Sequence, residues 1–393
     1  MRIKILALLL AFSFNALGQS ALKKAESLIE KRQYLSAFET LEKADPKNQN
    51  ADILYLKTEI VLKYFARSKN HQIFALHDLA ENEDLLELRT QNEGTYSMQI
   101  FQADSLIKNL LKDEPDNFKL HYILGRYYQE VYMKYGESPN MPETVLLKHM
   151  EMHFGIAYKN GIKKPMAAYG IGFYHLMQDD FSSAIPYLKD CTKLDPDYVP
   201  AHYNLAYAYL QLNRRSESIQ SAKKAFALYE DQTLKADAAR MIALSYAELD
   251  SLEQALVYYR HSDTLNPQNF YTLKTLMQLE IVLDSLSYPS TRLRFYELAP
   301  DKPSIYQELM NVHAANGMEQ ELLSFYQEQL REGPKDSLQF ANLNLFSAVL
   351  QKVLKQEEDW PISLARARKS FKEIYPADHQ VFVFMQSYFK EEH

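Results

Sequence analysis

Cysteine and glycine are scarce in this chain of 393 residues, and the motifs of common enzyme classes are missing. Cys191 is the only cysteine, which excludes an intramolecular disulfide, so packing alone must stabilise the fold. We expect its thiol to be buried and unreactive, beside Leu188. The low number of glycines, 10 in all, and the abundance of Leu, Ala, Tyr, Lys and Glu favour helices. Neither G-x-S-x-G nor G-K-[ST] occurs, so we expect a protein that is not an enzyme and carries no cofactor.

Basic residues are also not in excess, because the chain has 44 Lys and Arg residues and 51 Asp and Glu residues. The formal net charge of −7 repels phosphate backbones, so nucleic acid is not an expected partner. Past Gln19 the chain has no apolar run long enough to span a bilayer, and we expect no transmembrane segment there.

Residues 1–18 have the three regions of a cleavable signal peptide. Two positive charges come first, residues 5–14 form an apolar run too short to span a bilayer, and Ala-Leu-Gly at residues 16–18 suits cleavage before Gln19. The alternatives are an uncleaved anchor and a buried first helix. We expect an exported protein, periplasmic or secreted, whose mature chain of residues 19–393 has a formal charge of −9, because cleavage removes two basic residues and no acidic one.

The chain repeats itself with a regular period. Three prolines follow an alanine at the same offset of 12 residues, as Ala103 and Pro115, Ala184 and Pro196, and Ala255 and Pro267. Ala184 and Ser218 are 34 residues apart, and Ser218 and Ala255 are 37 apart. This spacing predicts a structural repeat of about 34 residues with a short insertion.

Each repeat is predicted to be a pair of helices. One helix is expected over residues 165–178 and a second over 181–194, which Asp195-Pro196 ends because the residue before a proline avoids helical backbone angles. Pro200 then falls in the first turn of the next helix, where a missing N–H costs little. Pro186 is expected to kink the second helix or delay its start.

Small residues recur where the two helices of a pair must approach. Gly172 and Ala184 in one repeat correspond to Ala206 and Ser218 in the next and to Ala243 and Ala255 in the third. A large side chain at these places would hold the helices apart. For the same reason we interpret Gly170 and Gly172 as helix-packing residues and not as a phosphate loop.

At these residues the chain resembles the tetratricopeptide repeat family. The match is clearest over residues 165–267, as in Leu205, Ala206 and Tyr209, and it lapses at 67–98 and 283–303. The resemblance implies an all-α fold, a right-handed α-solenoid of seven to nine stacked helical hairpins.

The C-terminal part is expected to end the stack. Residues 338–355 and 362–374 form another predicted hairpin, and the apolar stretch "HQVFVFMQSYF" follows it. This stretch either caps the last repeat or forms a strand that pairs with a partner, and periodicity does not separate the two.

The resemblance also implies a concave groove that binds a peptide or protein partner. Aligned with the family, the groove residues are Tyr122, Arg126, Tyr169, Phe173, Tyr203, Asn204, Tyr207 and Arg240. Asn204 matches an asparagine that, in this family, often bonds a peptide backbone, and Arg126 and Arg240 are expected to meet a carboxylate of the partner. The alternative is that most of these rings only pack between neighbouring repeats.

A second interpretation is a metal-binding or enzyme-associated module. His149 and His153 lie one helical turn apart on the same face, and His121 or Glu151 would have to supply a third ligand. The pattern is not H-E-x-x-H, because Met150 stands where the general base would be. We therefore expect no metal site and prefer an exported, non-enzymatic scaffold.

Overall fold

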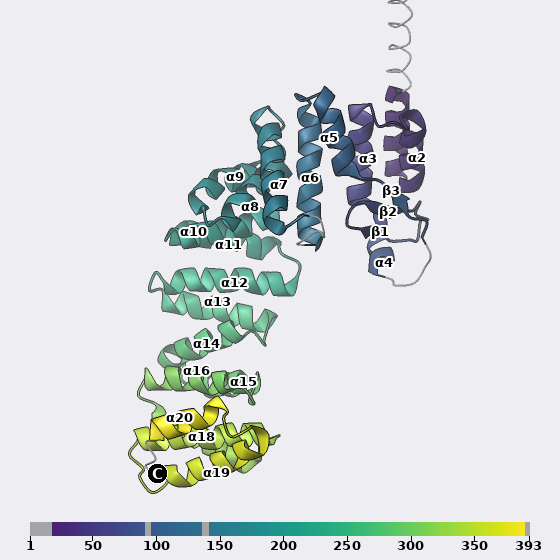
Figure 1. Ribbon diagram of the computed structural model, residues 1–393. Helices are drawn as coiled ribbons and strands as arrows, with labels where there is room; N and C mark the ends of the chain where they lie inside the picture. The colour runs from purple at the N-terminus through teal and green to yellow at the C-terminus, as the bar shows by residue number, and fades with distance from the viewer. Residues whose placement is uncertain (1–17, 91–95, 136–140, 390–393) are drawn as a thin grey trace, which may run out of the picture. The chain divides into compact units, whose positions relative to one another are not determined.

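A computed structural model describes residues 18–90, 96–135 and 141–389 of the chain (Figure 1). The chain is an all-α solenoid of stacked helical hairpins, as predicted, with one small sheet inserted. It divides into two compact units, Met1–Leu228 and Tyr229–His393. The expected signal peptide lies outside the described residues, apart from Gly18. No helix of the described part is long and apolar enough to cross a membrane.

In the first unit residues 18–30 are helical and pair with the next helix, and the later helices follow in pairs. The labelled helices, apart from one inside an insertion, are α2 (Tyr34–Ala44), α3 (Ala51–Lys63), α5 (Ala103–Asp113), α6 (Phe118–Tyr135), α7 (Glu143–Lys159), α8 (Pro165–Met177), α9 (Phe181–Leu194), α10 (Val199–Gln211) and α11 (Arg215–Leu228).

The second unit continues the same pattern. Its helices are α12 (Gln232–Ala247), α13 (Leu252–Leu265), α14 (Phe270–Leu283), α15 (Tyr288–Glu297), α16 (Pro303–Ala314), α17 (Glu319–Glu332), α18 (Ser337–Val353), α19 (Trp360–Ile374) and α20 (Gln380–Phe389). The apolar C-terminal stretch, for which the sequence allowed either a cap or a strand, forms the helix α20. Phe382, Met385 and Phe389 bury its apolar side against α18 and α19, so it caps the last hairpin.

The signals that end and start helices act where the sequence predicts. Pro165 occupies the first turn of α8, and Pro200 the first turn of α10. The Asp180 carboxylate accepts a hydrogen bond of 3.1 Å from the Ser183 N–H and caps α9. The expectation for Pro186 is corrected in one respect: it lies inside α9, but the helix still begins at Phe181.

Close approach of the paired helices depends on small residues, as expected. A Cβ on Gly172 would lie 2.9 Å from Leu188 Cγ and 3.3 Å from the Ala184 carbonyl oxygen, across the α8–α9 hairpin. Ala206 and Ala243 are fully buried at the corresponding places. Cys191 is also buried, and burial raises the pKa of its thiol to about 12, which keeps it protonated.

A small antiparallel sheet interrupts the hairpin made by α3 and α5. It consists of β1 (Phe65–Lys69), β2 (Ile73–Leu76) and β3 (Gln99–Ile100) in the order β1-β2-β3. The short helix α4 (Leu85–Thr90) lies between β2 and β3 in the chain. The sequence predicts no strand here, only a loss of the repeat pattern. Asn70 and His71 both take positive φ at the turn between β1 and β2, which allows a tight hairpin.

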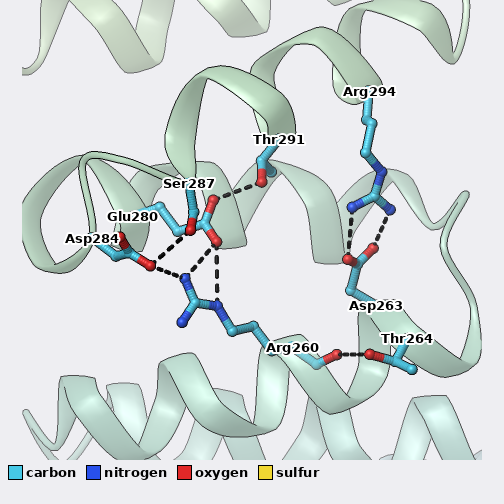
Figure 2. A network of polar contacts seen from close by, with 8 residues as sticks. All are labelled: Arg260, Asp263, Thr264, Glu280, Asp284, Ser287, Thr291 and Arg294. Atoms are coloured by element: carbon cyan, nitrogen blue, oxygen red, sulfur yellow. Dashed lines mark hydrogen bonds and ion pairs between the residues drawn. The ribbon is translucent and has the colours of Figure 1, made fainter.

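The other irregular segment, residues 283–303, is held by a polar network in the second unit (Figure 2). Glu280 on α14 is buried, and its carboxylate accepts hydrogen bonds from Arg260 on α13 at 2.9 Å and from Thr291 on α15 at 2.6 Å. Arg294 on α15 binds both oxygens of Asp263 on α13. The bidentate contact of Arg294 with Asp263 and the hydrogen bond of Thr291 to Glu280 thus fix the short α15 against α13 and α14.

Candidate binding surface

The surface predicted to bind a partner lies on the first helices of consecutive hairpins. Helices α6, α8 and α10 belong to the first unit and carry seven of the eight predicted residues, and Arg240 lies on α12 in the second unit. Helix α8 contacts both α6 and α10, so these three helices are neighbours. One face of each therefore contributes to a shared surface.

Three of the predicted residues, Tyr122, Arg126 and Tyr169, are buried, none more than 6% exposed. The Arg126 guanidinium forms an ion pair with Glu59 on α3. Burial would raise the pKa of the Glu59 carboxyl, but the charge of Arg126 and its hydrogen bond hold that pKa below its ordinary value. Arg126 was expected to meet a partner's carboxylate; the structure gives it one from its own chain.

The other four residues of this surface reach solvent. Phe173, Tyr203 and Asn204 are half-buried, and Tyr207 is 38% exposed. The Asn204 amide nitrogen donates a hydrogen bond of 3.1 Å to the Tyr169 hydroxyl. This hydrogen bond holds Asn204 against α8. We call Phe173, Tyr203, Asn204 and Tyr207 the α8–α10 surface.

Ring contacts support the α8–α10 surface from below. Tyr169 stacks on Phe173, with ring centroids 5.8 Å apart, and Phe181 meets Tyr207 edge to face at 5.8 Å. These geometries are the favourable ones for aromatic pairs. Phe173 is therefore held by a buried ring and Tyr207 by a half-buried one, which agrees with both interpretations that the sequence left open.

Two supporting residues were missed by sequence reasoning. Tyr132 on α6 contacts Phe173 at 5.7 Å, and Tyr198, just before α10, lies 5.0 Å from Tyr169. Tyr198 follows the Asp-Pro-Asp sequence that separates two repeats, and this position was a signal that could have identified it. Tyr132 lies outside the family pattern, and no sequence signal marks it.

Arg240 belongs to the second unit. It is half-buried on α12, and its guanidinium lies 3.3 Å from the Asp237 carboxylate one turn earlier on the helix. This partial pairing leaves a cationic side chain at the surface of the second unit. Its role toward a partner carboxylate stays a prediction.

The histidines of the second interpretation form a pair and not a cage. His121 Nδ1 and His153 Nδ1 lie 2.9 Å apart, whereas the His149 ring stacks on Tyr128 with centroids 4.9 Å apart. Burial lowers the pKa of all three imidazoles, so they are neutral at pH 7. Within the described ranges no group of three His, Cys, Asp or Glu side chains is arranged to hold a metal ion.

Two family models match part of the chain. Residues 175–240 and 236–269 match two family models, each described as "Tetratricopeptide repeat". Over these segments the chain is similar to the tetratricopeptide repeat family. The segments cover α9 to α13 and the end of α8, almost entirely within the stretch where the sequence pattern is clearest. Tetratricopeptide repeats generally mediate interactions between proteins.

Several solved structures are similar to parts of the chain. The protein MamA is 20% identical over 42% of this chain and 82% of its own, with a TM-score of 0.35. YrrB, described as a TPR protein with an unusual peptide-binding site, is 17% identical over 44% and 81%, with a TM-score of 0.38. PilF from Pseudomonas aeruginosa is 20% identical over 53% and 88%, with a TM-score of 0.40. No curated protein matches the chain.

Proposed function

We propose that this protein is an exported, non-enzymatic scaffold that binds a peptide or protein partner on the α8–α10 surface. The observation that supports the proposal best is the exposure of Tyr207 beside the half-buried Phe173, Tyr203 and Asn204, on repeats of a type that mediates protein interactions. The rings of Tyr169 and Phe181 hold Phe173 and Tyr207 in place before a partner arrives. Little rotamer entropy is then lost on binding.

The chemistry of the surface suits a peptide backbone flanked by apolar side chains. Tyr203 and Tyr207 combine a large apolar ring with a hydroxyl group, the combination found most often in energetically important interface residues. The Asn204 amide nitrogen is engaged with Tyr169, so its amide oxygen is the atom suited to accept a peptide N–H. No charged side chain is needed for this mode of recognition.

Export is proposed from residues 1–18 and predicts a processed chain. When the full sequence is produced with its own N-terminus in a bacterium, N-terminal sequencing of the purified protein is expected to start at Gln19. A periplasmic or secreted location follows from that cleavage. A purified chain that still starts at Met1 would contradict the export part and leave the binding proposal untouched.

Binding at the α8–α10 surface predicts a specific loss when its tyrosines are removed. Once a partner has been captured from the exported fraction, the double variant Tyr203→Ala and Tyr207→Ala is expected to weaken its affinity by about 2 to 4 kcal/mol, as for truncated aromatic anchors. Titration calorimetry measures the change. The matched control is Tyr187→Ala on α9, a half-buried tyrosine of the second helix, which is expected to bind as the wild type does. Equal affinities for all three folded proteins would mean that the rings are structural.

A further inference from the structure

The second unit contains a cavity of about 640 Å³ between α16, α18 and α20. Its wall is aromatic and aliphatic and includes Met310, Phe346, Phe371, Tyr375, Phe384 and Tyr388. Phe384 and Tyr388 are 40% and 37% exposed, although both are large apolar side chains on the capping helix. Cavities of about 300 to 1,000 Å³ lined mainly by apolar and aromatic groups are typical of small-molecule sites.

The lining of this C-terminal cavity carries no fixed charge. None of the described residues that line it is Asp, Glu, Lys or Arg. Its exposed edge carries the amides Gln307, Asn311 and Gln380 and the Tyr388 hydroxyl, and the half-buried His379 also lines it. A charged ligand group would lose its hydration here without gaining an opposite charge, so the lining disfavours phosphates, carboxylates and ammonium groups.

One residue of the lining, Asn342, has a buried polar atom that lacks a partner in the described part of the chain. Asn342 on α18 is fully buried, and its Nδ2 donates a hydrogen bond of 2.8 Å to the Asp301 carbonyl oxygen. Because a carbonyl only accepts, this contact fixes which end of the amide is nitrogen. The remaining Oδ1 is buried and has no hydrogen-bond partner in the part of the chain that the structure describes. Such an atom in a native structure requires an explanation, since an unmet acceptor destabilises the fold.

We propose that the C-terminal cavity binds a neutral, largely aromatic small molecule that donates one hydrogen bond from an O–H or N–H group to Asn342 Oδ1. The ligand's rings contact Phe346, Phe371 and Phe384, and its donor satisfies the buried acceptor. This site belongs to the second unit alone, whereas the α8–α10 surface belongs to the first. The proposal therefore stands or fails independently of partner binding.

Matched probes test the site on the full chain by titration calorimetry. The probes are 2-naphthol, which has a donor, naphthalene, which has none, and 2-naphthoate, which is charged. We expect 2-naphthol to bind and 2-naphthoate not to bind. In Asn342→Leu the ratio of the Kd of naphthalene to the Kd of 2-naphthol is expected to fall roughly 3- to 10-fold, the loss of one hydrogen bond.

A second pair of variants keeps the test valid if Asn342→Leu does not fold. Gln380→Trp at the exposed edge is expected to obstruct the cavity and abolish 2-naphthol binding, whereas Gln386→Trp, exposed on the same helix but outside the lining, is expected to retain it. Circular dichroism checks that each variant is folded. The proposal is overturned if no neutral probe binds, if 2-naphthoate binds as well as 2-naphthol, or if the ratio is unchanged in folded Asn342→Leu. If N-acetylphenylalaninamide binds whereas naphthalene and 2-naphthol do not, the proposal is also overturned and the cavity is a peptide site.

Discussion

At the scale of single residues, one aromatic ring and two glycines determine how closely the helices α6, α7 and α8 pack. The Phe154 ring of α7 lies between Gly125 on α6 and Gly170 on α8, and a Cβ on either glycine would lie within 2.6 Å of a ring atom. Such a distance forces a shift of the ring or of the backbone. Gly170, like Gly172, is thus a packing residue, as the sequence indicated.

Gly170→Ala is therefore expected to destabilise the protein. Alanine favours a helix over glycine by about 1 kcal/mol, but overpacking against Phe154 costs about 1 to 3 kcal/mol, so we expect a net loss of up to roughly 2 kcal/mol. Urea denaturation measures it. The matched control is Gly155→Ala on α7, where a new Cβ would meet only the flexible Glu151 side chain at 3.3 Å, and no loss is expected. Replacing the ring by a smaller side chain, as in Phe154→Leu, is expected to reduce the destabilisation that Gly170→Ala causes.

The buried histidine pair predicts how stability depends on pH. Burial, together with the nearby His121 and His149, lowers the pKa of His153 to about 3 from 6.5. As the pH falls below 6.5 the unfolded chain binds this proton and the native chain does not, so stability is lost between pH 6.5 and 3. The expected contribution is a loss of about 2 kcal/mol between pH 7 and 5. In His153→Leu the difference in unfolding free energy between these two pH values is expected to shrink by that amount, and an unchanged difference would contradict the burial of a neutral imidazole.

At the scale of elements, the sequence predicted the hairpins because each one carries its own local signals. Helix α9 begins and ends at the predicted residues, and a left-handed residue turns the chain between the helices of successive hairpins: Asp179, Asn213 and Asp250, each with φ between 55° and 59°. They are 34 and 37 residues apart, which is the period of the repeat itself. Asp and Asn are among the few residues that tolerate this conformation.

The inserted sheet was not predicted because its evidence is not local. Strands β1 and β2 have only 5 and 4 residues, and β3 has 2 residues that pair with Ile73 and Phe74 from far along the chain. A short apolar run does not separate strand from helix. The loss of the repeat pattern at residues 67–98 located the insertion but did not specify its structure.

Ala206→Leu tests the helix crossing in the α10–α11 hairpin. Ala206 is fully buried where the helices cross, so the larger side chain is expected to lower the free energy of unfolding by about 1 to 3 kcal/mol. Lys223→Leu, exposed on α11, is the control and is expected to change it by less than about 0.5 kcal/mol. A denaturation midpoint for Ala206→Leu equal to that of the wild type would contradict the assigned crossing.

At the scale of the whole molecule, the sequence located the candidate surface but could not say which of its residues are available. Alignment with the repeat family placed Arg126 and Tyr207 in equivalent roles. The structure separates them, because Arg126 pairs with Glu59, 67 residues away on α3, while Tyr207 reaches solvent. A pairing over that distance leaves no trace in the local pattern. The same holds for the C-terminal cavity, whose lining comes from four helices.

Hydrogen exchange of the full chain, with and without its captured partner, tests the central claim most directly. The proposed function predicts added protection in peptides that cover Pro165–Met177 and Val199–Gln211, the helices α8 and α10, with little change in peptides from α20. Protection confined to other segments, with α8 and α10 exchanging as in the free protein, would contradict the assignment of the binding surface.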